Sequence, residues 1–483
     1  MLFNSIDFAV FLPIVFVLYW FVANKNLKLQ NYLIVLASYT FYGWWDWRFL
    51  SLILFSTIID YYVGRRLLVE GNVLKRKVLL WISILVNLGF LGFFKYYNFF
   101  LDNFVSAFSF FGTELNANSL NIILPVGISF YTFQTLSYTI DVYRRKLEPT
   151  KDFIAFTAFV SFFPQLVAGP IERASNLLPQ FYKKRTFEYT KAVDGLRQIL
   201  WGLFKKIVIA DNSAQLANEI FNNSDSYSGS TLVLGAIFFT FQIYGDFSGY
   251  SDIAIGTSRL FGFNLKQNFA FPYFSRDIAE FWRRWHISLS TWFRDYLYIP
   301  LGGSRGGTWM KVRNTFIIFI VSGFWHGANW TFIIWGALNA LYFLPLLLLN
   351  KNRTNKDTVA EGKYLPSFKE LFQIGITFSL TVLAWVFFRA ENIGHAISYL
   401  STIFSSSIFD FPKFKTSRLF TLQVIIMIIL FIIIEWKGRT SEYALEKIGF
   451  RWNKYLRLSL YFSIVLLIFM FLGKEQQFIY FQF

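Results

Sequence analysis

The distribution of apolar residues along the chain predicts a helical membrane protein. A spanning helix needs about 20 consecutive, mostly apolar residues, and windows of this kind recur along nearly the whole sequence. The windows are residues 7–23, 29–46, 48–63, 78–95, 121–142, 192–210, 231–247, 313–349, 370–388, 419–435 and 455–472. Runs such as VIIMIILFIII do not alternate apolar and polar residues as the strands of a membrane barrel do. Because hydrocarbon forces every backbone polar group into an internal hydrogen bond, we expect an all-α polytopic integral membrane protein with roughly eleven to thirteen spans.

Polar residues interrupt this pattern in three places. Segment 99–111 carries Asp102 and Asn103, and segment 152–182 contains the break PQLVAGPIERA, so both are predicted to be interfacial or re-entrant. The polar stretch 350–367 is predicted to be a linker within a single membrane domain, 1–483. It divides an N-terminal region and core, 1–349, from C-terminal helices, 368–483. The core holds the segment in which we expect the active site, 277–340.

The segment DIAEFWRRWHISLSTWFRDYLYIPLGG, residues 277–303, does not read as a span. On a helical wheel six apolar residues form one stripe: Trp282, Trp285, Leu289, Trp292, Phe293 and Tyr296. Arg283, Arg284 and Arg294 lie off the stripe, and His286 lies at its edge. The pattern predicts a helix in the membrane interface, with its aromatic face toward bilayer or protein and its cationic face toward phosphates.

A second histidine lies deep in an apolar run. Residues 313–349 are 37 residues long and contain only Arg313 and His326 as ionisable groups. The run is either two short tilted helices that meet near HGAN or one span that continues into a broken one. Because ionisable groups inside membranes are usually functional, we interpret His326 as a general base that activates a hydroxyl for attack on an ester or thioester. The neighbouring Gly323 and Gly327 allow close approach of either a helix or a substrate.

Composition excludes several kinds of chemistry. The chain has no cysteine, which excludes disulfides, thiolate metal sites and a cysteine acyl-enzyme. Its three histidines form no metal-binding motif, so we expect no metal. Gly302, Ser304 and Gly306 match G-x-S-x-G, but in a basic loop rather than a strand-to-helix turn, and we interpret the match as coincidence.

The net charge of +17 is explained by membrane topology and attraction to anionic lipid, and we expect no nucleic-acid partner. The basic connection 64–77 is predicted to be cytoplasmic, which places the N-terminus outside after two spans are counted back. Connections 112–120 and 222–230 have no Lys or Arg and are predicted to be exterior. The first apolar stretch has no basic region before it and no cleavage signature after it, so it is expected to be retained.

Four motifs resemble those of the membrane-bound O-acyltransferase superfamily, in the bacterial branch that includes the membrane proteins of alginate O-acetylation and of D-alanyl-lipoteichoic acid transfer. They are GISFYTFQTLSYTIDVYR at 127–144, FFPQLVAGPIER at 162–173, IYGDFSGYSDIAIG at 243–256, and FWRRWHISLSTWFRDYLYIPLGGSR continuing to SGFWHGANWTFIIWGALNA, within 281–340. The chain ends, MLFNSIDF and FIYFQF, are also similar. The resemblance implies a ring of helices around a thin centre, with a tunnel between cytoplasmic donor and exterior acceptor. It also implies that His326 is the family's intramembrane histidine and that His286 occupies the second active-site position.

The expected function is that of an acetyltransferase in the inner or plasma membrane. It passes an acetyl group from acetyl-coenzyme A, with no bound cofactor, to an exported polysaccharide or to an extracytoplasmic acetyltransferase partner. Arg283, Arg284, Arg294 and Arg305 are expected to hold the donor's phosphates, although a lipid-facing role for these cations is equally open. The alternatives are transfer of D-alanine from a carrier protein to teichoic acid and, in a different class, a flippase for a lipid-linked sugar.

Overall fold

The structure, a computed structural model, describes residues 1–112, 115, 118–167, 169–473 and 476–479. These residues form helices and connections, without a strand among them, which confirms the all-α prediction. The predicted exterior connection 112–120, the motif 162–173 and the chain end FIYFQF lie partly outside the described residues.

Six helices in the described part of the chain are long and apolar enough to cross a membrane. They are Ile6–Lys25, Val73–Phe110, Gly229–Leu260, Trp330–Leu348, Phe368–Arg389 and Arg418–Gly438. Other predicted windows also lie in helices, but in helices that are more polar or interrupted. Window 121–142, for example, is helical only from Ile128, because residues 121–125 are irregular and a turn follows, in which Gly127 adopts a left-handed conformation (φ 73°).

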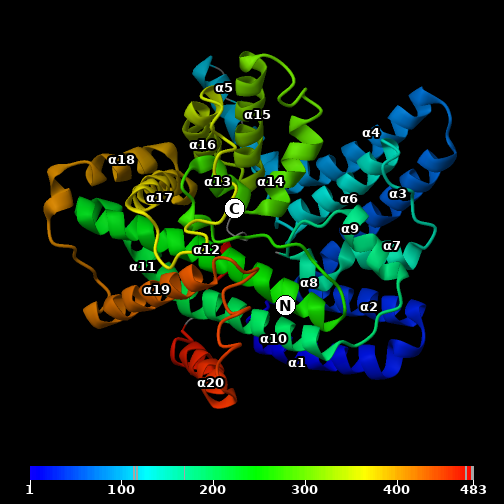
Figure 1. Ribbon diagram of the computed structural model, residues 1–483. Helices are drawn as coiled ribbons and strands as arrows, with labels where there is room; N and C mark the ends of the chain where they lie inside the picture. The colour runs from blue at the N-terminus through cyan, green and yellow to red at the C-terminus, as the bar shows by residue number, and fades with distance from the viewer. Residues whose placement is uncertain (113–114, 116–117, 168, 474–475, 480–483) are drawn as a thin grey trace. The chain divides into compact units, whose positions relative to one another are not determined.

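Two compact units make up the chain: residues 1–192 with 257–266, and residues 193–256 with 267–483. The linker 350–367 therefore lies inside the second unit rather than at a boundary between units. The helices of unit 1 are α1 Ile6–Val17, α2 Leu27–Asp46, α3 Leu50–Val69, α4 Val73–Leu91, α5 Tyr97–Phe110, α6 Ile128–Tyr143, α7 Phe153–Ser161, α8 Phe163–Leu166 and α9 Ala174–Leu177 (Figure 1).

The core of unit 1 contains a buried carboxylate. Helices α3, α4 and α6 lie side by side (Figure 1) and bury Asp60 of α3 completely. Ser83 donates a hydrogen bond to this carboxylate, as do Asn87 (2.8 Å) and Thr139 (3.1 Å). A carboxylate at such depth is tolerated because hydroxyl and amide donors replace water.

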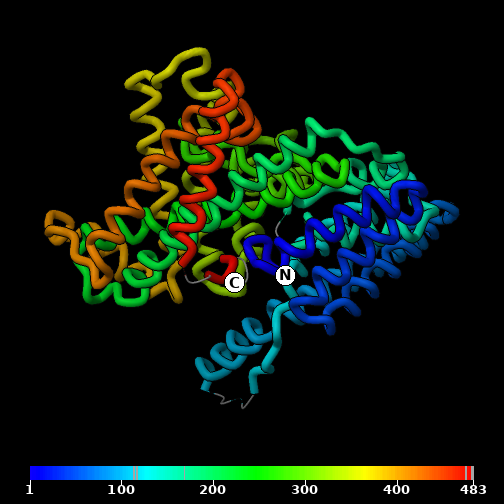
Figure 2. The backbone as a smooth tube through the Cα atoms, turned by 90° about the horizontal axis from the view of Figure 1, so that it is seen from below, coloured from blue at the N-terminus to red at the C-terminus, as the bar shows by residue number. Residues whose placement is uncertain are grey.

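Segment 99–111 continues a longer helix. A π-helical segment, Gly92–Tyr96, joins α4 to α5 into one helical run, Val73–Phe110, of 38 residues. Its interfacial or re-entrant position stays a prediction. Figure 2 shows α5 extending away from α2 and α3, and α5 buries no residue. The described residues of 152–182 form short helices, α7, α8, α9 and the 3-10 segment Leu178–Tyr182, with many buried side chains. The interfacial or re-entrant position of this segment stays a prediction.

The helices of unit 2 are α10 Tyr189–Leu203, which begins in unit 1, α11 Asp211–Phe221, α12 Gly229–Leu260, which ends in unit 1, α13 Ile278–Arg284, α14 Ile287–Phe293, α15 Thr308–His326, α16 Trp330–Leu348, α17 Phe368–Arg389, α18 Ile393–Ile403, α19 Arg418–Gly438 and α20 Lys454–Met470. A π-helical segment, Phe204–Ala210, links α10 to α11, and another, Arg294–Tyr298, follows α14. The apolar run 313–349 thus forms two helices, α15 and α16, that meet at HGAN, one of the two arrangements predicted.

The continuous helix expected over 277–303 is interrupted. Two helices of seven residues, α13 and α14, flank His286, which has φ 43° and ψ 55°. Four residues of the predicted apolar stripe are buried in the protein: Trp285, Leu289, Trp292 and Phe293. The aromatic face therefore packs mainly against protein rather than bilayer.

Candidate active site

His326 is the last residue of α15 and lies where the chain turns into α16. Asn329 caps α16 by accepting a hydrogen bond from the backbone N–H of Thr331 (3.0 Å), which fixes the turn. The side chain is 3% exposed. Its ring makes perpendicular contact with Trp335 (centroids 5.2 Å apart, 88°) and lies 5.3 Å from the ring of Phe388. His326 is therefore a buried imidazole with aromatic walls.

The glycines around His326 serve helix packing. A Cβ atom on Gly323 would overlap the carbonyl oxygen of Phe332 in α16, and one on Gly336 would overlap the carbonyl oxygen of Phe319 in α15. A Cβ on Gly327 would collide with the ring of Phe332. Of the two roles left open by the sequence, close helix approach is the one that these contacts support.

His286 is held by a side chain 18 residues earlier. Its Nδ1 lies 3.3 Å from Oδ1 of Asn268, an oxygen that also accepts hydrogen bonds from the Ser288 hydroxyl (2.8 Å) and backbone N–H (3.2 Å). The amide of Asn268 donates in turn to Ser251 of α12 (3.2 Å), and the backbone N–H of Ile287 donates to the Asn268 carbonyl (2.9 Å). Because a carbonyl oxygen only accepts, Nδ1 carries the proton and the lone pair is on Nε2.

The imidazole of His286 is uncharged. It is fully buried and packs edge-on against the ring of Phe247, with centroids 4.6 Å apart. Burial lowers its pKa from 6.5 to about 3, because desolvation penalises the imidazolium. This pKa favours a neutral imidazole at physiological pH, so His286 does not attract an anion by charge.

One aromatic cluster contains both histidines. The ring of Trp325 lies 6.1 Å from that of His286 and 4.9 Å from that of His326. Trp335 stacks on Trp385 (5.5 Å, 18°), and Trp385 contacts Trp285, the residue before His286. Residues 40 positions apart in sequence therefore both lie beside one indole ring.

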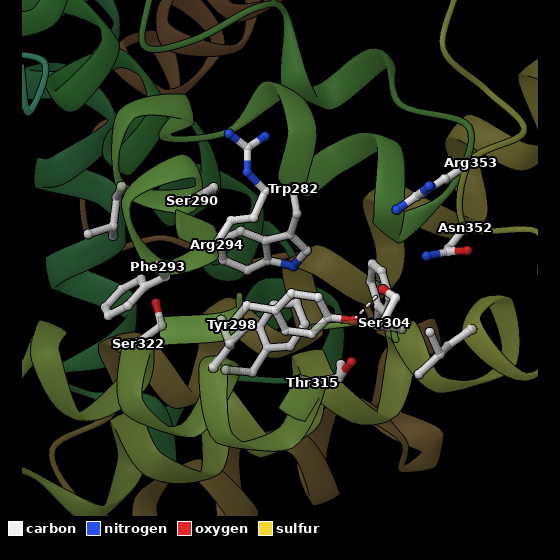
Figure 3. A pocket seen from close by; sticks show the side chains of 15 residues that line it. Trp282, Ser290, Phe293, Arg294, Tyr298, Ser304, Thr315, Ser322, Asn352 and Arg353 are labelled. Carbon is white, nitrogen blue, oxygen red and sulfur yellow. Dashed lines mark hydrogen bonds between the residues drawn. The ribbon is translucent and has the colours of Figure 1, made fainter. Parts of the chain in front are cut away.

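A cavity of about 220 Å³ lies beside this cluster (Figure 3). Helices α13, α14, α15 and α16, the segment after α14 and the linker supply its lining, including Leu289, Phe293, Phe319, Phe343 and Leu347. Trp282 belongs to both the cavity lining and the aromatic cluster, because its ring lies 5.7 Å from that of Trp335, which contacts His326. Ser322, one turn before His326 on α15, also lines the cavity.

Two cations line the same cavity. Arg294 pairs with Asp295 (2.7 Å), and Arg353 comes from the linker 350–367. In Figure 3 Arg353 and Asn352 lie on the side opposite Ser322 and Phe293. An apolar lining with cations suits a slender, uncharged chain attached to an anionic group.

The other cations predicted to bind a donor lie elsewhere. Arg283 donates to the carbonyl oxygens of Asn352 (2.8 Å) and Asn355, and Arg284 donates to that of Asp357 (2.9 Å) and pairs with Glu280. They hold the linker beside the cavity. Arg305 is exposed in the turn that follows Ser304. Ser304 itself bonds to the hydroxyl of Tyr298 (2.9 Å).

Sequence analysis missed Asn268, Arg353 and a buried ionic cluster. In that cluster Lys205 pairs with Asp252 (2.5 Å), and Lys206 pairs with Asp246 and Asp211 (2.8 Å each). Asp246 and Asp252 of α12 lie in the motif IYGDFSGYSDIAIG. Two carboxylates within an apolar helix could therefore have indicated a buried ionic cluster from the sequence. For Asn268 and Arg353 there was no local signal.

Helices of spanning length, together with two buried histidines beside a cation-lined cavity, are features of a membrane-embedded transferase. The sequence profile of MBOAT, the membrane-bound O-acyltransferase family, matches residues 144–381. The chain is 40% identical over 446 residues to the probable alginate O-acetylase AlgI of Pseudomonas aeruginosa. The aligned region covers 92% of this chain and 82% of that protein. The chain belongs to the membrane-bound O-acyltransferase family, and it is an acyltransferase.

Two further relatives differ in the reaction that their names state. The peptidoglycan O-acetyltransferase of Helicobacter pylori is 35% identical, with 100% of this chain and 98% of that protein covered. The teichoic acid D-alanyltransferase of Bacillus subtilis is 28% identical, with 57% of this chain and 71% of that protein covered. The similarity is therefore greater, and covers more of both chains, for the two O-acetylating relatives.

Proposed function

We propose that this protein moves an acetyl group from cytoplasmic acetyl-coenzyme A across the inner or plasma membrane to an exported polysaccharide of the cell envelope. The acceptor is alginate-like or peptidoglycan, and it receives the acetyl group directly or through an extracytoplasmic acetyltransferase partner. The similarities to an alginate O-acetylase and to a peptidoglycan O-acetyltransferase, which cover most of each chain, support the acetyl group. The observation that carries the proposal is the meeting of His286 and His326 in one buried cluster beside a cation-lined cavity.

In the proposed reaction the acceptor hydroxyl oxygen attacks the thioester carbonyl carbon. His326 takes the hydroxyl proton as the C–O bond forms, and the C–S bond breaks to release the thiolate of coenzyme A. The thiolate then takes this proton from His326. His286 orients the donor or shares the proton through its Nε2 lone pair, since Asn268 holds Nδ1. Direct transfer is the simplest route, because the chain has no cysteine to form an acyl-enzyme.

The cavity at Trp282 is the proposed entry for the donor. Its apolar lining accommodates the slender thioester arm, and Arg294 and Arg353 lie where they can meet phosphates. Arg283 and Arg284 would support donor binding indirectly, by holding the linker that carries Arg353. Arg305 would contact the donor's phosphates from the exposed turn after Ser304. Trp282 lines the cavity and its ring contacts Trp335, which contacts His326, so these two rings link the proposed entry to the proposed base.

Substitution of His326 tests this assignment. We expect His326→Asn to lower acetyl transfer about 100- to 10,000-fold, the usual contribution of a general base. The measurement is transfer from radiolabelled acetyl-coenzyme A to glycan by the purified protein in lipid nanodiscs. His395→Asn is the matched control, since His395 lies on α18, where its ring faces Ser224 (3.2 Å). Full activity of a correctly inserted His326→Asn protein would exclude the proposed base.

Transfer of D-alanine from a carrier protein is the second candidate function. The similarity to the teichoic acid D-alanyltransferase favours it, and the cavity would accept the phosphopantetheine arm of a carrier protein equally well. Mass spectrometry of the envelope from a deletion strain separates the two, because either acetyl esters or D-alanyl esters disappear. A flippase, the candidate from another class, would leave the thioester of radiolabelled acetyl-coenzyme A uncleaved.

A further inference from the structure

Unit 1 contains a second polar cavity, formed where α3 ends, α4 begins and α6 ends. Its volume is about 340 Å³. Three cations, Arg76, Arg145 and Lys146, line it together with one carboxylate, Glu148, and the apolar side chains of Leu67 and Val142. All of these residues belong to unit 1, whereas both active-site histidines belong to unit 2.

The cavity carries an excess of positive charge. Three cations and one carboxylate leave a net charge of plus two. Arg76 is 7% exposed and donates to the carbonyl oxygens of Leu67, Glu70 and Tyr143, which are neutral and leave its charge uncompensated. Arg145 and Lys146 are exposed and make no ion pair among the described residues. The cavity is therefore suited to a small anion.

Arg145 occupies a strained backbone position. Helix α6 ends in a Schellman motif, in which the N–H of Lys146 donates to the carbonyl of Asp141 (2.8 Å) and that of Arg145 donates to Val142 (3.0 Å). The motif places Arg145 in the left-handed region, at φ 58°. Glycine adopts this conformation without the steric cost that a Cβ atom brings. A strained residue that is also a cation of the cavity points to a role for its side chain.

The cavity lies at the end of a membrane span. Arg76 is in the first turn of α4, at the start of the apolar helical run Val73–Phe110, so it lies near one end of a candidate membrane span. The surrounding connections, GRRLLVEGNVLKRK and RRKLE, contain eight cations and two carboxylates. Such connections face the cytoplasm, where the leaflet is rich in anionic lipid.

We propose that this cavity binds the phosphate of an anionic phospholipid from the cytoplasmic leaflet. Arg145 and Lys146 contact the phosphate oxygens, Arg76 supplies charge from the floor of the cavity, and Leu67 and Val142 contact the glycerol and first acyl carbons. The site lies in a different unit from the active site, and it does not depend on which acyl group the enzyme transfers.

Native mass spectrometry of the full-length protein with phosphatidylglycerol and phosphatidylcholine tests this proposal. Wild type is expected to retain phosphatidylglycerol at least fivefold more than phosphatidylcholine, and loss of one cation should lower that retention about fivefold. Lys146→Gln removes a charge, and Arg145→Gly removes a charge while relieving the strained backbone. Arg145→Gly should therefore lose lipid while its unfolding temperature stays the same or rises, which separates binding from folding. Lys28→Gln removes an exposed charge that does not line the cavity, and it should retain the lipid.

Three outcomes would overturn the proposal. If Arg145→Gly and Lys146→Gln both retained as much phosphatidylglycerol as the wild type, the cavity would not be the site that holds the lipid. An equal loss in Lys28→Gln would show attraction to total charge rather than a site. Displacement of the lipid by millimolar inorganic phosphate would assign the cavity to a soluble phosphate instead.

Discussion

At the scale of single residues, the two histidines differ in how they are held. His326 lies among aromatic rings, whereas His286 is bound by Asn268, which is itself fully buried and anchored to Ser251. Asn268 is thus a positioning residue that selects the tautomer of His286. Its effect on transfer would come through the imidazole rather than through contact with substrate.

Replacement of Asn268 by Leu or Asp tests this role. Leu keeps the volume but removes the acceptor, so we expect about 10- to 100-fold lower transfer through misorientation of His286. Asp keeps an acceptor oxygen and should retain more activity. Nitrogen-15 NMR can read the tautomer directly, because the chain has three histidines and His326→Gln and His395→Gln leave one imidazole signal. An unchanged spectrum and unchanged transfer in Asn268→Leu would contradict the role.

At the scale of helices, the crossing of α15 and α16 positions His326. Gly323 and Gly336 let each helix lie against a carbonyl of the other, and the chain turns between them at Gly327. The length of the apolar run predicted either two helices that meet near HGAN or one span that continues into a broken one, and the structure has the first arrangement. The interruption at His286 was not predicted, since a helical wheel assumes a continuous helix and gives no sign of a left-handed residue.

Gly323→Ala is expected to destabilise this crossing. The added methyl group overlaps the backbone of Phe332, and overpacking of this kind costs about 1–3 kcal/mol. The variant should unfold at a lower temperature in a thermal unfolding assay and lose activity as His326 moves. Gly375→Ala in α17 is the control, because nothing lies within 4 Å of a Cβ there. Equal stability of the two variants would show that the crossing tolerates separation.

At the scale of the whole molecule, the distribution of charge predicts sidedness. Loop 64–77 is predicted to be cytoplasmic and connection 222–230 exterior, from the presence and absence of Lys and Arg. The proposed lipid site and the proposed direction of acyl transfer both depend on this predicted orientation. The orientation can be measured directly, because the chain has no cysteine and a single introduced cysteine is therefore its only thiol.

Single-cysteine labelling provides the measurement. Gly71→Cys and Ser226→Cys occupy exposed positions in the two connections. With an impermeant maleimide on intact spheroplasts, we expect Ser226→Cys to react and Gly71→Cys to react only after the membrane is opened. Reaction of both thiols from the outside would show that the predicted orientation is wrong.

The sequence by itself determined that the protein is helical and embedded in a membrane, because hydropathy and backbone hydrogen bonding act locally along each span. It also singled out His286 and His326, since few ionisable groups stand in apolar surroundings. Only the tertiary structure decided that Asn268 binds His286, that Trp325 lies beside His286, and that the linker residue Arg353 lines the neighbouring cavity. These contacts join residues distant in sequence, and they depend on how helices pack rather than on any local pattern.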